Sequence, residues 1–182
     1  MGLVVFFMFI TFARNKVWYD DLPLWQDVEK KSPNKDRAHF QLGFYFAAHD
    51  RVDAAIREYE TVIKIIPNAS DAYNNLGQLY EKKDRHYDAF TAYQAAVKFD
   101  PENAEPHNNL GLFYQKRGSY VEAMGQYEIA LSLQPHYATA LQNLFFLCEE
   151  LNYNSAFSPE NYPETSKNRH NCSTLYEQYR SL

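Results

Sequence analysis

Carboxamide side chains recur in this sequence at a fixed spacing that suits the recognition of a peptide backbone. One series has members 34 residues apart, and a second series stands one position earlier: Gln41, Asn75, Asn109 and Asn143, with Asn74, Asn108 and Gln142. A carboxamide both donates and accepts hydrogen bonds, so a regular ladder of them can hold an extended backbone without reading its side chains. The other interpretation is structural, with these amides bonding neighbouring helices to one another. Both predict repeated elements beneath them.

Catalytic and metal-binding patterns are missing from the sequence. No two histidines form a close pair at metal-ligand spacing. The sequence contains no GxSxG motif, P-loop or glycine-rich dinucleotide motif. Adjacent carboxylates such as Glu149 and Glu150 have no matched acid or base partner. We therefore predict a chain that is not an enzyme and has no catalytic, cofactor-binding or metal-binding residues.

Charge and cysteine content exclude two further classes. The chain carries 18 Lys and Arg against 23 Asp and Glu, and it has no basic block, which argues against nucleic acid as a partner. Its two cysteines form neither a CxxC pair nor a disulfide framework. Cys148 falls on an apolar helical position, where a buried thiol is expected, and Cys172 lies in a polar tail; a disulfide between the two is the alternative.

The elements that position the carboxamides repeat with the same period of 34 residues. Prolines, leucines, glycines and tyrosines all recur in phase: Pro33, Pro67, Pro101 and Pro135; Leu42, Leu76, Leu110 and Leu144; Gly43, Gly77 and Gly111; Tyr59, Tyr93 and Tyr127. In register, the repeats run 36–69, 70–103 and 104–137. We number positions within each repeat from its first residue.

Each repeat has the pattern of two helices joined by a tight turn. Positions four, seven, eight and eleven lie on one face of a first helix. Glycine at position eight allows the second helix to approach, and we expect the alanine at position twenty to meet it. Asp50, Asp84 and Gly118 mark the turns, and Gly118 suits a left-handed helix end. The prolines at position thirty-two should end the second helices.

This pattern resembles the tetratricopeptide repeat (TPR) family over residues 36–137. The resemblance implies an all-α TPR solenoid of three antiparallel helix pairs, whose first helices line a concave face that binds a protein or peptide. The carboxamide series would lie on that face, as in the similar asparagine ladder of O-linked N-acetylglucosamine transferases. Position five offers Phe40 and carboxamides rather than lysine, so recognition of chaperone C-termini is not expected. An unrelated helical bundle is the alternative fold.

Both ends of the array have a cover. Residues 20–35 place Trp25, Val28 and Pro33 in phase with a second helix, which predicts a half-repeat helix at the N-terminal end. Residues 138–152 read as a first helix without a second, and Phe145 takes the place of the close-approach glycine. This helix should cap the array, because each repeat leaves a face that a neighbour must cover. Residues 153–182 are polar and are predicted to be a disordered tail.

The N-terminal segment, residues 1–19, carries an apolar run at residues 2–13 that ends at Arg14. Twelve helical residues span about 18 Å, which is less than the roughly 30 Å hydrocarbon core of a bilayer. No basic region precedes the run and no cleavage site follows it, so a cleaved signal peptide is not expected. We predict membrane association through a transmembrane helix formed by this segment, with a buried or interfacial helix as the alternative.

Residues 11–35 resemble the junction between the last membrane helix and the TPR arm of multi-spanning glycosyltransferases, of the protein O-mannosyltransferase type and their bacterial relatives. The matching residues are Arg14, Asn15, Trp18, Asp20, Asp21 and Trp25. The membrane-embedded catalytic part of those enzymes is absent here. The resemblance implies repeats on the periplasmic or lumenal side, although the positive-inside rule applied to Arg14 and Lys16 favours the opposite orientation. The sequence therefore predicts a membrane-tethered scaffold that binds proteins, or alternatively an accessory arm of such a glycosyltransferase.

Overall fold

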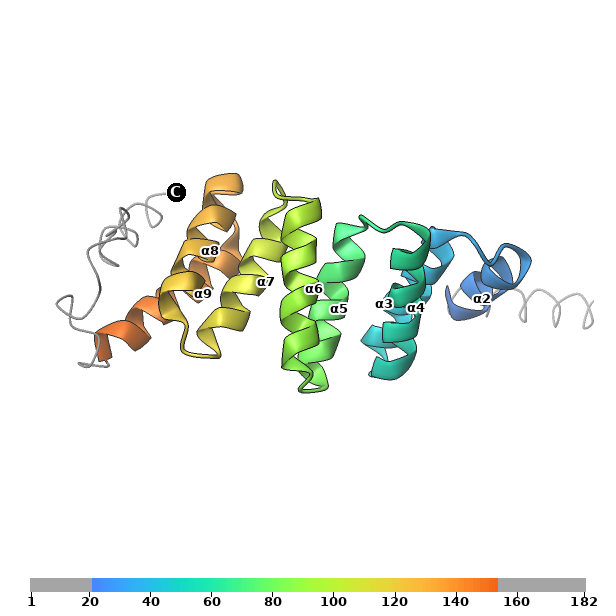
Figure 1. The fold of residues 1–182 in the computed structure, drawn as a ribbon, viewed down its shortest axis with the longest axis horizontal. Helices are drawn as coiled ribbons and strands as arrows, with labels where there is room; N and C mark the ends of the chain where they lie inside the picture. The colour runs from blue at the N-terminus through green and yellow to red at the C-terminus, as the bar shows by residue number, and fades with distance from the viewer. Residues whose placement is uncertain (1–20, 154–182) are drawn as a thin grey trace, which may run out of the picture. The chain divides into compact units, whose positions relative to one another are not determined.

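The computed structural model describes residues 21–153, which form eight helices and no strand (Figure 1). The helices are α2 (Asp21–Lys31), α3 (Asp36–Ala48), α4 (Val52–Ile65), α5 (Ser70–Lys82), α6 (His86–Phe99), α7 (Ala104–Gln115), α8 (Tyr120–Leu133) and α9 (Ala138–Tyr153). The predicted all-α class is confirmed. The apolar run at residues 2–13 and the polar tail lie outside the described residues. Between residues 21 and 153, none of the helices combines the length and apolar character needed to cross a bilayer.

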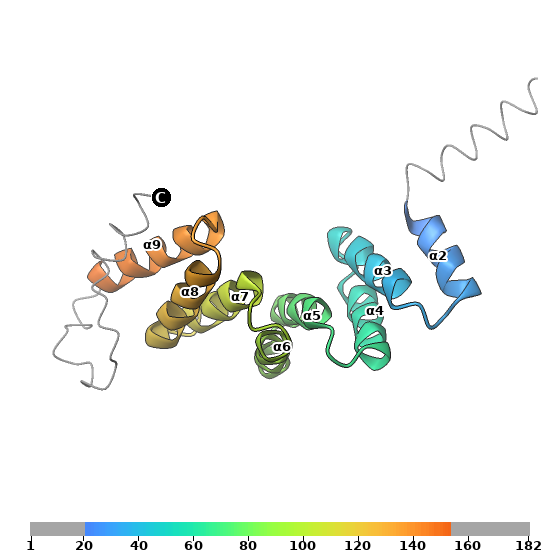
Figure 2. The same cartoon turned by 90° about the horizontal axis from the view of Figure 1, so that it is seen from above.

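The chain divides into two compact units, Met1–Ala92 and Tyr93–Leu182, with the boundary inside α6. In the first unit, α3 and α4 lie side by side as a pair, and α2 and α5 pack against α3 and α4, respectively (Figure 2). In the second unit, α7 and α8 form the corresponding pair, and α9 packs against both. The first unit therefore contains the predicted half-repeat helix, and the second contains the predicted capping helix.

The turns within the helix pairs have the backbone geometry that the sequence predicts. Asp50, Asp84 and Gly118 have φ values of 58°, 56° and 73°, the left-handed conformation that ends many helices. In the first turn, the N–H of Arg51 donates to the carbonyl of Phe46 over 2.8 Å, and the Arg51 guanidinium lies 4.5 Å from the centroid of the Phe46 ring. This cation–π contact lies at the C-terminal end of α3, where many helices have a hydrophobic contact instead.

The repeated prolines follow the ends of the second helices. Helices α2, α4, α6 and α8 each end two residues before a proline, at Lys31, Ile65, Phe99 and Leu133. A proline lacks the N–H that would continue the helix, and it disfavours helical backbone at the residue before it. The proline series therefore ends the second helices as predicted.

The glycines at position eight allow close helix approach, but the group nearest to them is not the alanine at position twenty. A Cβ atom built on Gly43 would lie 3.0 Å from the ring of Tyr59, and one built on Gly111 would lie 2.7 Å from the ring of Tyr127. Both tyrosines occupy position twenty-four. The expected alanine is close to Gly111 as well, through the carbonyl oxygen of Ala123 at 3.2 Å. The prediction therefore needs correction, because the tyrosine ring fills most of the space that the glycine leaves.

The core of the second unit includes one face of α9. Ala140, Leu144, Leu147 and Cys148 of this helix are buried with Tyr127 and other residues of α8. Their spacing of three and four residues is that of a single helical face. Cys148 is disulfide-bonded rather than a thiol, so the expected thiol is wrong, and the partner cysteine lies outside the described residues.

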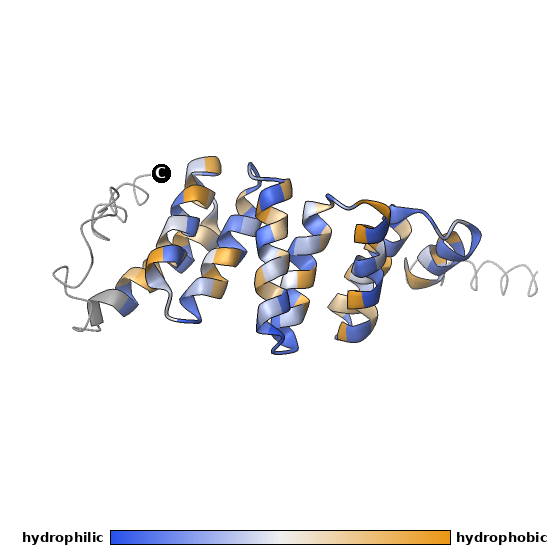
Figure 3. Cartoon of the chain, in the orientation of Figure 1, coloured by the Kyte–Doolittle hydropathy of each residue, from blue (hydrophilic) through white to orange (hydrophobic). Residues whose placement is uncertain are grey.

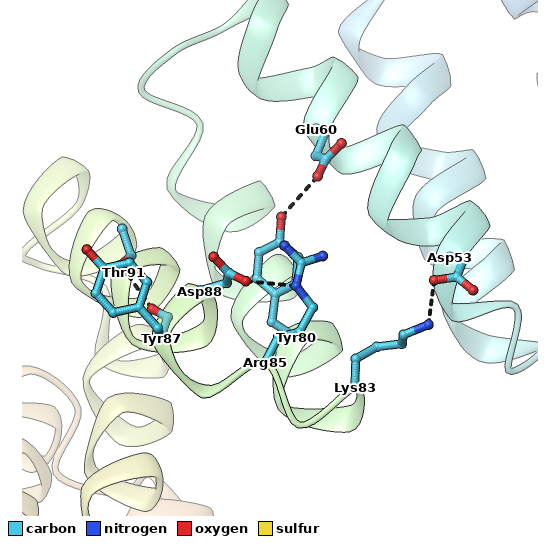
Figure 4. Close-up of polar contacts among 8 residues, drawn as sticks. All are labelled: Asp53, Glu60, Tyr80, Lys83, Arg85, Tyr87, Asp88 and Thr91. Atoms are coloured by element: carbon cyan, nitrogen blue, oxygen red, sulfur yellow. Dashed lines mark hydrogen bonds and ion pairs between the residues drawn. The ribbon is translucent and has the colours of Figure 1, made fainter.

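Polar contacts tie α5 and the following turn to α4 in the first unit (Figure 4). The Tyr80 hydroxyl donates to Glu60 over 3.1 Å, and Lys83 pairs with Asp53 over 2.8 Å. The Arg85 guanidinium lies 4.4 Å from the centroid of the Tyr80 ring, which repeats the arrangement of the first turn. Burial, together with the hydrogen bond to Glu60, raises the pKa of Tyr80 to about 12.

Candidate functional site

The carboxamides at position six lie on the first helix of each pair and are partly accessible. Gln41 stands on α3 and Asn75 on α5 in the first unit, and Asn109 stands on α7 and Asn143 on α9 in the second. All four have intermediate exposure. The predicted series therefore provides two partly exposed amides within each unit.

The carboxamides at position five are placed differently from one another. Asn74 and Asn108 are 4% and 2% exposed, so neither offers its amide directly to a ligand. Gln142 is exposed, and Phe40, which holds this position on α3, is half-buried. We expected both series to lie on an open face. This is wrong for position five of α5 and α7, where the asparagine side chains are buried.

In the second unit, three amides form a hydrogen-bonded chain. Asn143 donates through Nδ2 to Oδ1 of Asn108 over 2.9 Å, which joins α9 to α7. Asn108 in turn donates through Nδ2 to Oδ1 of Asn109 over 3.3 Å. Buried amides need such partners. The structural interpretation of the carboxamides therefore holds for Asn108 and Asn143, which join two neighbouring first helices.

Each unit has an exposed phenylalanine beside a position-six carboxamide, and the sequence reasoning missed both. Phe44 on α3 is 62% exposed and Phe146 on α9 is 50% exposed. Each lies three residues after a position-six carboxamide, a spacing that brings side chains onto the same side of a helix. Hydrophobic and hydrophilic residues alternate along the helices (Figure 3). Phe44 and Phe146 both stand at position nine, which lies on the same face of the first helix as position six. The sequence pattern could therefore have identified them.

The position-four histidine of the first repeat is buried in a polar setting. His39 is 5% exposed. Its Nδ1 lies 2.7 Å from a carboxylate oxygen of Glu58, and its Nε2 lies 2.8 Å from the carbonyl oxygen of Pro33. Burial alone lowers the pKa of His39, but the hydrogen bonds to Glu58 and Pro33 and the charges of Glu58 and Glu29 outweigh it, so the net pKa is raised. His39 therefore packs in the core, in acidic surroundings.

The corresponding histidine of the third repeat has neutral partners. His107 is also 5% exposed, and its Nδ1 and Nε2 lie 2.8 Å from Gln126 and 3.1 Å from the Pro101 carbonyl. The Gln126 amide can accept from or donate to the ring. One backbone slot thus accommodates two different kinds of histidine pair.

A second polar network holds α9 to the α7–α8 pair. Glu150 accepts from the Tyr120 hydroxyl over 2.6 Å and from Gln115 over 3.3 Å. The Tyr127 hydroxyl donates to Gln115 over 2.8 Å. Glu150, for which the sequence suggested no acid or base partner, therefore has a structural role near the C-terminal end of α9.

These features define a class of protein: an α-solenoid of antiparallel helix pairs whose first helices present amides and apolar side chains. The family model described as "TPR repeat" matches residues 46–84 and 85–118. Those two stretches therefore match tetratricopeptide repeats, and the fold of the described residues is that of a TPR solenoid. No curated protein sequence matches this chain.

Solved TPR structures share the fold at low sequence identity. A crystal structure of MamA aligns with a TM-score of 0.68 at 20% identity, over 86% of this chain and 83% of that one. The Arabidopsis OM64 TPR domain aligns with a TM-score of 0.60 at 19% identity, over 63% of this chain and 95% of that one. The first TPR domain of Spaghetti (RPAP3), bound to the HSP90 peptide SRMEEVD, gives 0.61 at 19% identity, over 65% and 94%. These similarities establish the fold.

Proposed function

We propose that this chain is a non-catalytic scaffold that binds an extended peptide segment of a partner protein along its first helices. The observation that carries the proposal is the pairing of the half-buried carboxamide of Gln41 with the exposed ring of Phe44 on one side of α3. On α9 the exposed Phe146 stands beside Asn143 in the same way, but the Asn143 amide already donates to Asn108. The amide offers hydrogen bonds to a peptide backbone. The aromatic ring offers apolar area with little conformational freedom to lose.

The side chains at position five, next to the position-six carboxamides, indicate which kind of peptide the chain would bind. The RPAP3 TPR domain was solved with a peptide that contains acidic residues near its end, which supports peptides as ligands of this fold. In this chain, position five supplies Phe40, two buried asparagines and Gln142, and none of these can pair with a terminal carboxylate as a cation would. The ligand we propose is therefore an internal, extended segment with apolar residues, rather than an acidic C-terminus.

Selection of random-sequence peptides on the full chain tests this proposal. A selected peptide should lose affinity when Gln41 and Phe44 are both replaced by alanine. One hydrogen bond contributes about 0.5–1.5 kcal/mol and a buried phenylalanine about 1.5–3 kcal/mol, so the double variant should bind at least about tenfold more weakly. Tyr87→Ala is the matched control, because Tyr87 is an aromatic residue that is 81% exposed on a second helix, α6.

Two results would contradict the proposal. One is equal affinity of the Gln41→Ala/Phe44→Ala variant and the wild type. The other is a loss of affinity in Tyr87→Ala that is as large as the loss in the double variant, which would place binding on the second helices. Far-UV circular dichroism and melting of each variant would separate lost binding from lost folding, because both replaced side chains of the double variant are partly or mostly exposed.

We also propose that residues 2–13 tether the scaffold to a membrane, with the repeats on the periplasmic or lumenal side. The support is the uncharged apolar run and the junction that follows it. Full-length protein should fractionate with membranes and resist extraction by salt, whereas a chain lacking residues 1–13 should be soluble. Recovery of both proteins in the soluble fraction would overturn the tether.

The second candidate is an accessory arm of a membrane glycosyltransferase that presents protein substrate to it. The observation that favours it is the junction motif from Arg14 to Trp25. An open reading frame that encodes membrane helices in phase upstream of Met1 would support this candidate. A stop codon in that frame close to Met1 would leave the independent scaffold.

A further inference from the structure

We propose that Glu29, His39 and Glu58 form a binding site for a divalent transition-metal ion, best matched by Zn²⁺, in the first unit. One ligand atom from each of the three side chains lies within 4.8 Å of the other two. The residues come from three different helices, α2, α3 and α4. None of these residues belongs to the peptide-binding face, so this proposal is independent of that function.

The orientation of the imidazole is that of a metal ligand. The Nε2 atom of His39 lies 2.8 Å from the Pro33 carbonyl, which can only accept, so Nε2 carries a proton. Metal-ligating histidines are usually fixed in this way, with the second ring nitrogen donating to a carbonyl or carboxylate. Its Nδ1 lies 2.7 Å from the Glu58 carboxylate. A ring nitrogen and a carboxylate approach so closely only when a cation, either a proton or a metal ion, lies between them.

The donor set selects the kind of ion. One imidazole nitrogen and two carboxylate oxygens suit Zn²⁺ and its first-row neighbours, whereas Mg²⁺ prefers oxygen ligands and retains its water. Ligands about 2.0–2.1 Å from a tetrahedral Zn²⁺ are about 3.3 Å apart, so the His39–Glu58 pair would open by about 0.6 Å. The Glu58 side chain is 18% exposed and Glu29 is of intermediate exposure, so both carboxylates can shift and a water molecule can take the fourth position.

The other repeats provide an internal comparison, because residues 34 and 68 positions later stand at the same places in the pattern. The three ligands correspond to Ile63, Tyr73 and Ala92 in the second set, and to Val97, His107 and Gln126 in the third. Neither set can supply three ligands. The third set keeps the histidine, its carbonyl partner and an amide at Nδ1, so the slot also accommodates a histidine whose side-chain partner is neutral. Among the three sets, the two carboxylates therefore occur only in the first.

The site would fasten the N-terminal helix to the first repeat. Glu29 is on α2, and His39 reaches back to the carbonyl of Pro33, in the connection between α2 and α3. An ion bound by all three residues would hold α2 against the α3–α4 pair. An ion that binds the folded state stabilises it in proportion to the logarithm of the ion concentration above Kd, so the metal should raise the melting temperature of the full chain.

Titration of Zn²⁺ into the full chain, after treatment with a chelator, tests the proposal by calorimetry and thermal melting. We expect one ion per chain and a higher melting temperature with Zn²⁺. Glu58→Gln recreates the histidine–amide pair found at His107, and Glu29→Gln removes the second carboxylate at constant size. Each should reduce Zn²⁺ affinity at least about tenfold while the chain stays folded without metal. Glu149→Gln, an exposed carboxylate on α9, is the control and should bind as the wild type does.

Three outcomes would overturn the proposal. If Zn²⁺ does not bind at millimolar concentration, only a proton lies between His39 and Glu58, and the pair is an ordinary hydrogen bond. Affinity unchanged in both Glu58→Gln and Glu29→Gln would assign binding to histidines elsewhere on the chain. Equal affinity for Mg²⁺ and Zn²⁺ would indicate a simple acidic surface without coordination by the imidazole. A Co²⁺ titration, followed by visible absorption, provides a readout of coordination that does not depend on stability.

Discussion

Replacement of Gly111 by alanine should show directly how the helix pair of the second unit is packed. An added Cβ would lie 2.7 Å from Cε1 and 2.8 Å from Cδ1 of Tyr127, and 3.2 Å from the carbonyl oxygen of Ala123. The Tyr127 ring is fully buried, and its hydroxyl donates to Gln115. The ring therefore has no open space to retreat into, so α7 and α8 must move apart.

Two opposing effects set the size of the change. Alanine in a helix interior is favoured over glycine by about 0.8–1 kcal/mol. Overpacking of a well-filled core costs about 1–3 kcal/mol, and the contact with Tyr127 is closer than real Cβ atoms show. The upper part of that range should therefore apply, and Gly111→Ala should lower the free energy of unfolding by about 1–2 kcal/mol net.

Gly125 provides the matched control on α8. A Cβ atom at Gly125 meets nothing within 4 Å, so Gly125→Ala should gain the helix preference without a packing cost and raise the free energy of unfolding by about 0.5–1 kcal/mol. Urea unfolding of both variants, followed by far-UV circular dichroism, measures the two changes. A Tyr127→Leu background should remove most of the cost of Gly111→Ala, because the ring is then absent. Changes of the same sign in Gly111→Ala and Gly125→Ala would refute this account of the packing.

Three further outcomes follow from single contacts. Asp84→Gly should raise the free energy of unfolding by about 0.5–1 kcal/mol, because Asp84 holds a φ of 56° that glycine adopts without strain; destabilisation in urea would contradict this. Asn143→Ala should lower the free energy of unfolding by about 1–3 kcal/mol, because the buried Oδ1 atom of Asn108 loses its donor. Gln142→Ala, at an exposed residue, should leave that free energy near the wild-type value. Burial and the Glu60 bond raise the pKa of Tyr80 from 10.0 to about 12, so the stability that depends on its protonated form is complete below pH 10 and is lost as the pH rises to about 12. Tyr80→Phe should flatten that alkaline loss in urea midpoints measured across this range, and an unchanged slope would count against the shift.

The repeat itself could be derived from the sequence, because its signals are local. The prolines end helices through their own backbone, and a left-handed residue such as Gly118 ends a first helix whatever surrounds it. The nearest partner of a close-approach glycine could not be derived in the same way. Gly43 and Tyr59 are on different helices, so their contact depends on how deeply the helices pack, and periodicity does not report that depth.

The candidate site was predictable in part for the same reason. Periodicity places a carboxamide on a helix face, but it does not distinguish a side chain that reaches solvent from one that reaches the next helix. Gln142 is exposed, while the adjacent Asn143 bonds to Asn108. The exposed Phe44 and Phe146 were accessible to the same positional reasoning, and we missed them because polar residues were expected to form the binding face.

The 34-residue pattern does not determine which side chains stand at positions four and twenty-three. The pairs are His39 with Glu58, Tyr73 with Ala92, and His107 with Gln126. Each histidine stands opposite a polar side chain that reaches its Nδ1 atom, and the larger tyrosine is matched by an alanine. The backbone pattern fixes the slot, and the two side chains then adjust to each other in size and hydrogen bonding. Because this adjustment does not disturb the 34-residue period, a slot can gain charge, as in the first repeat, while the helices around it keep the same packing.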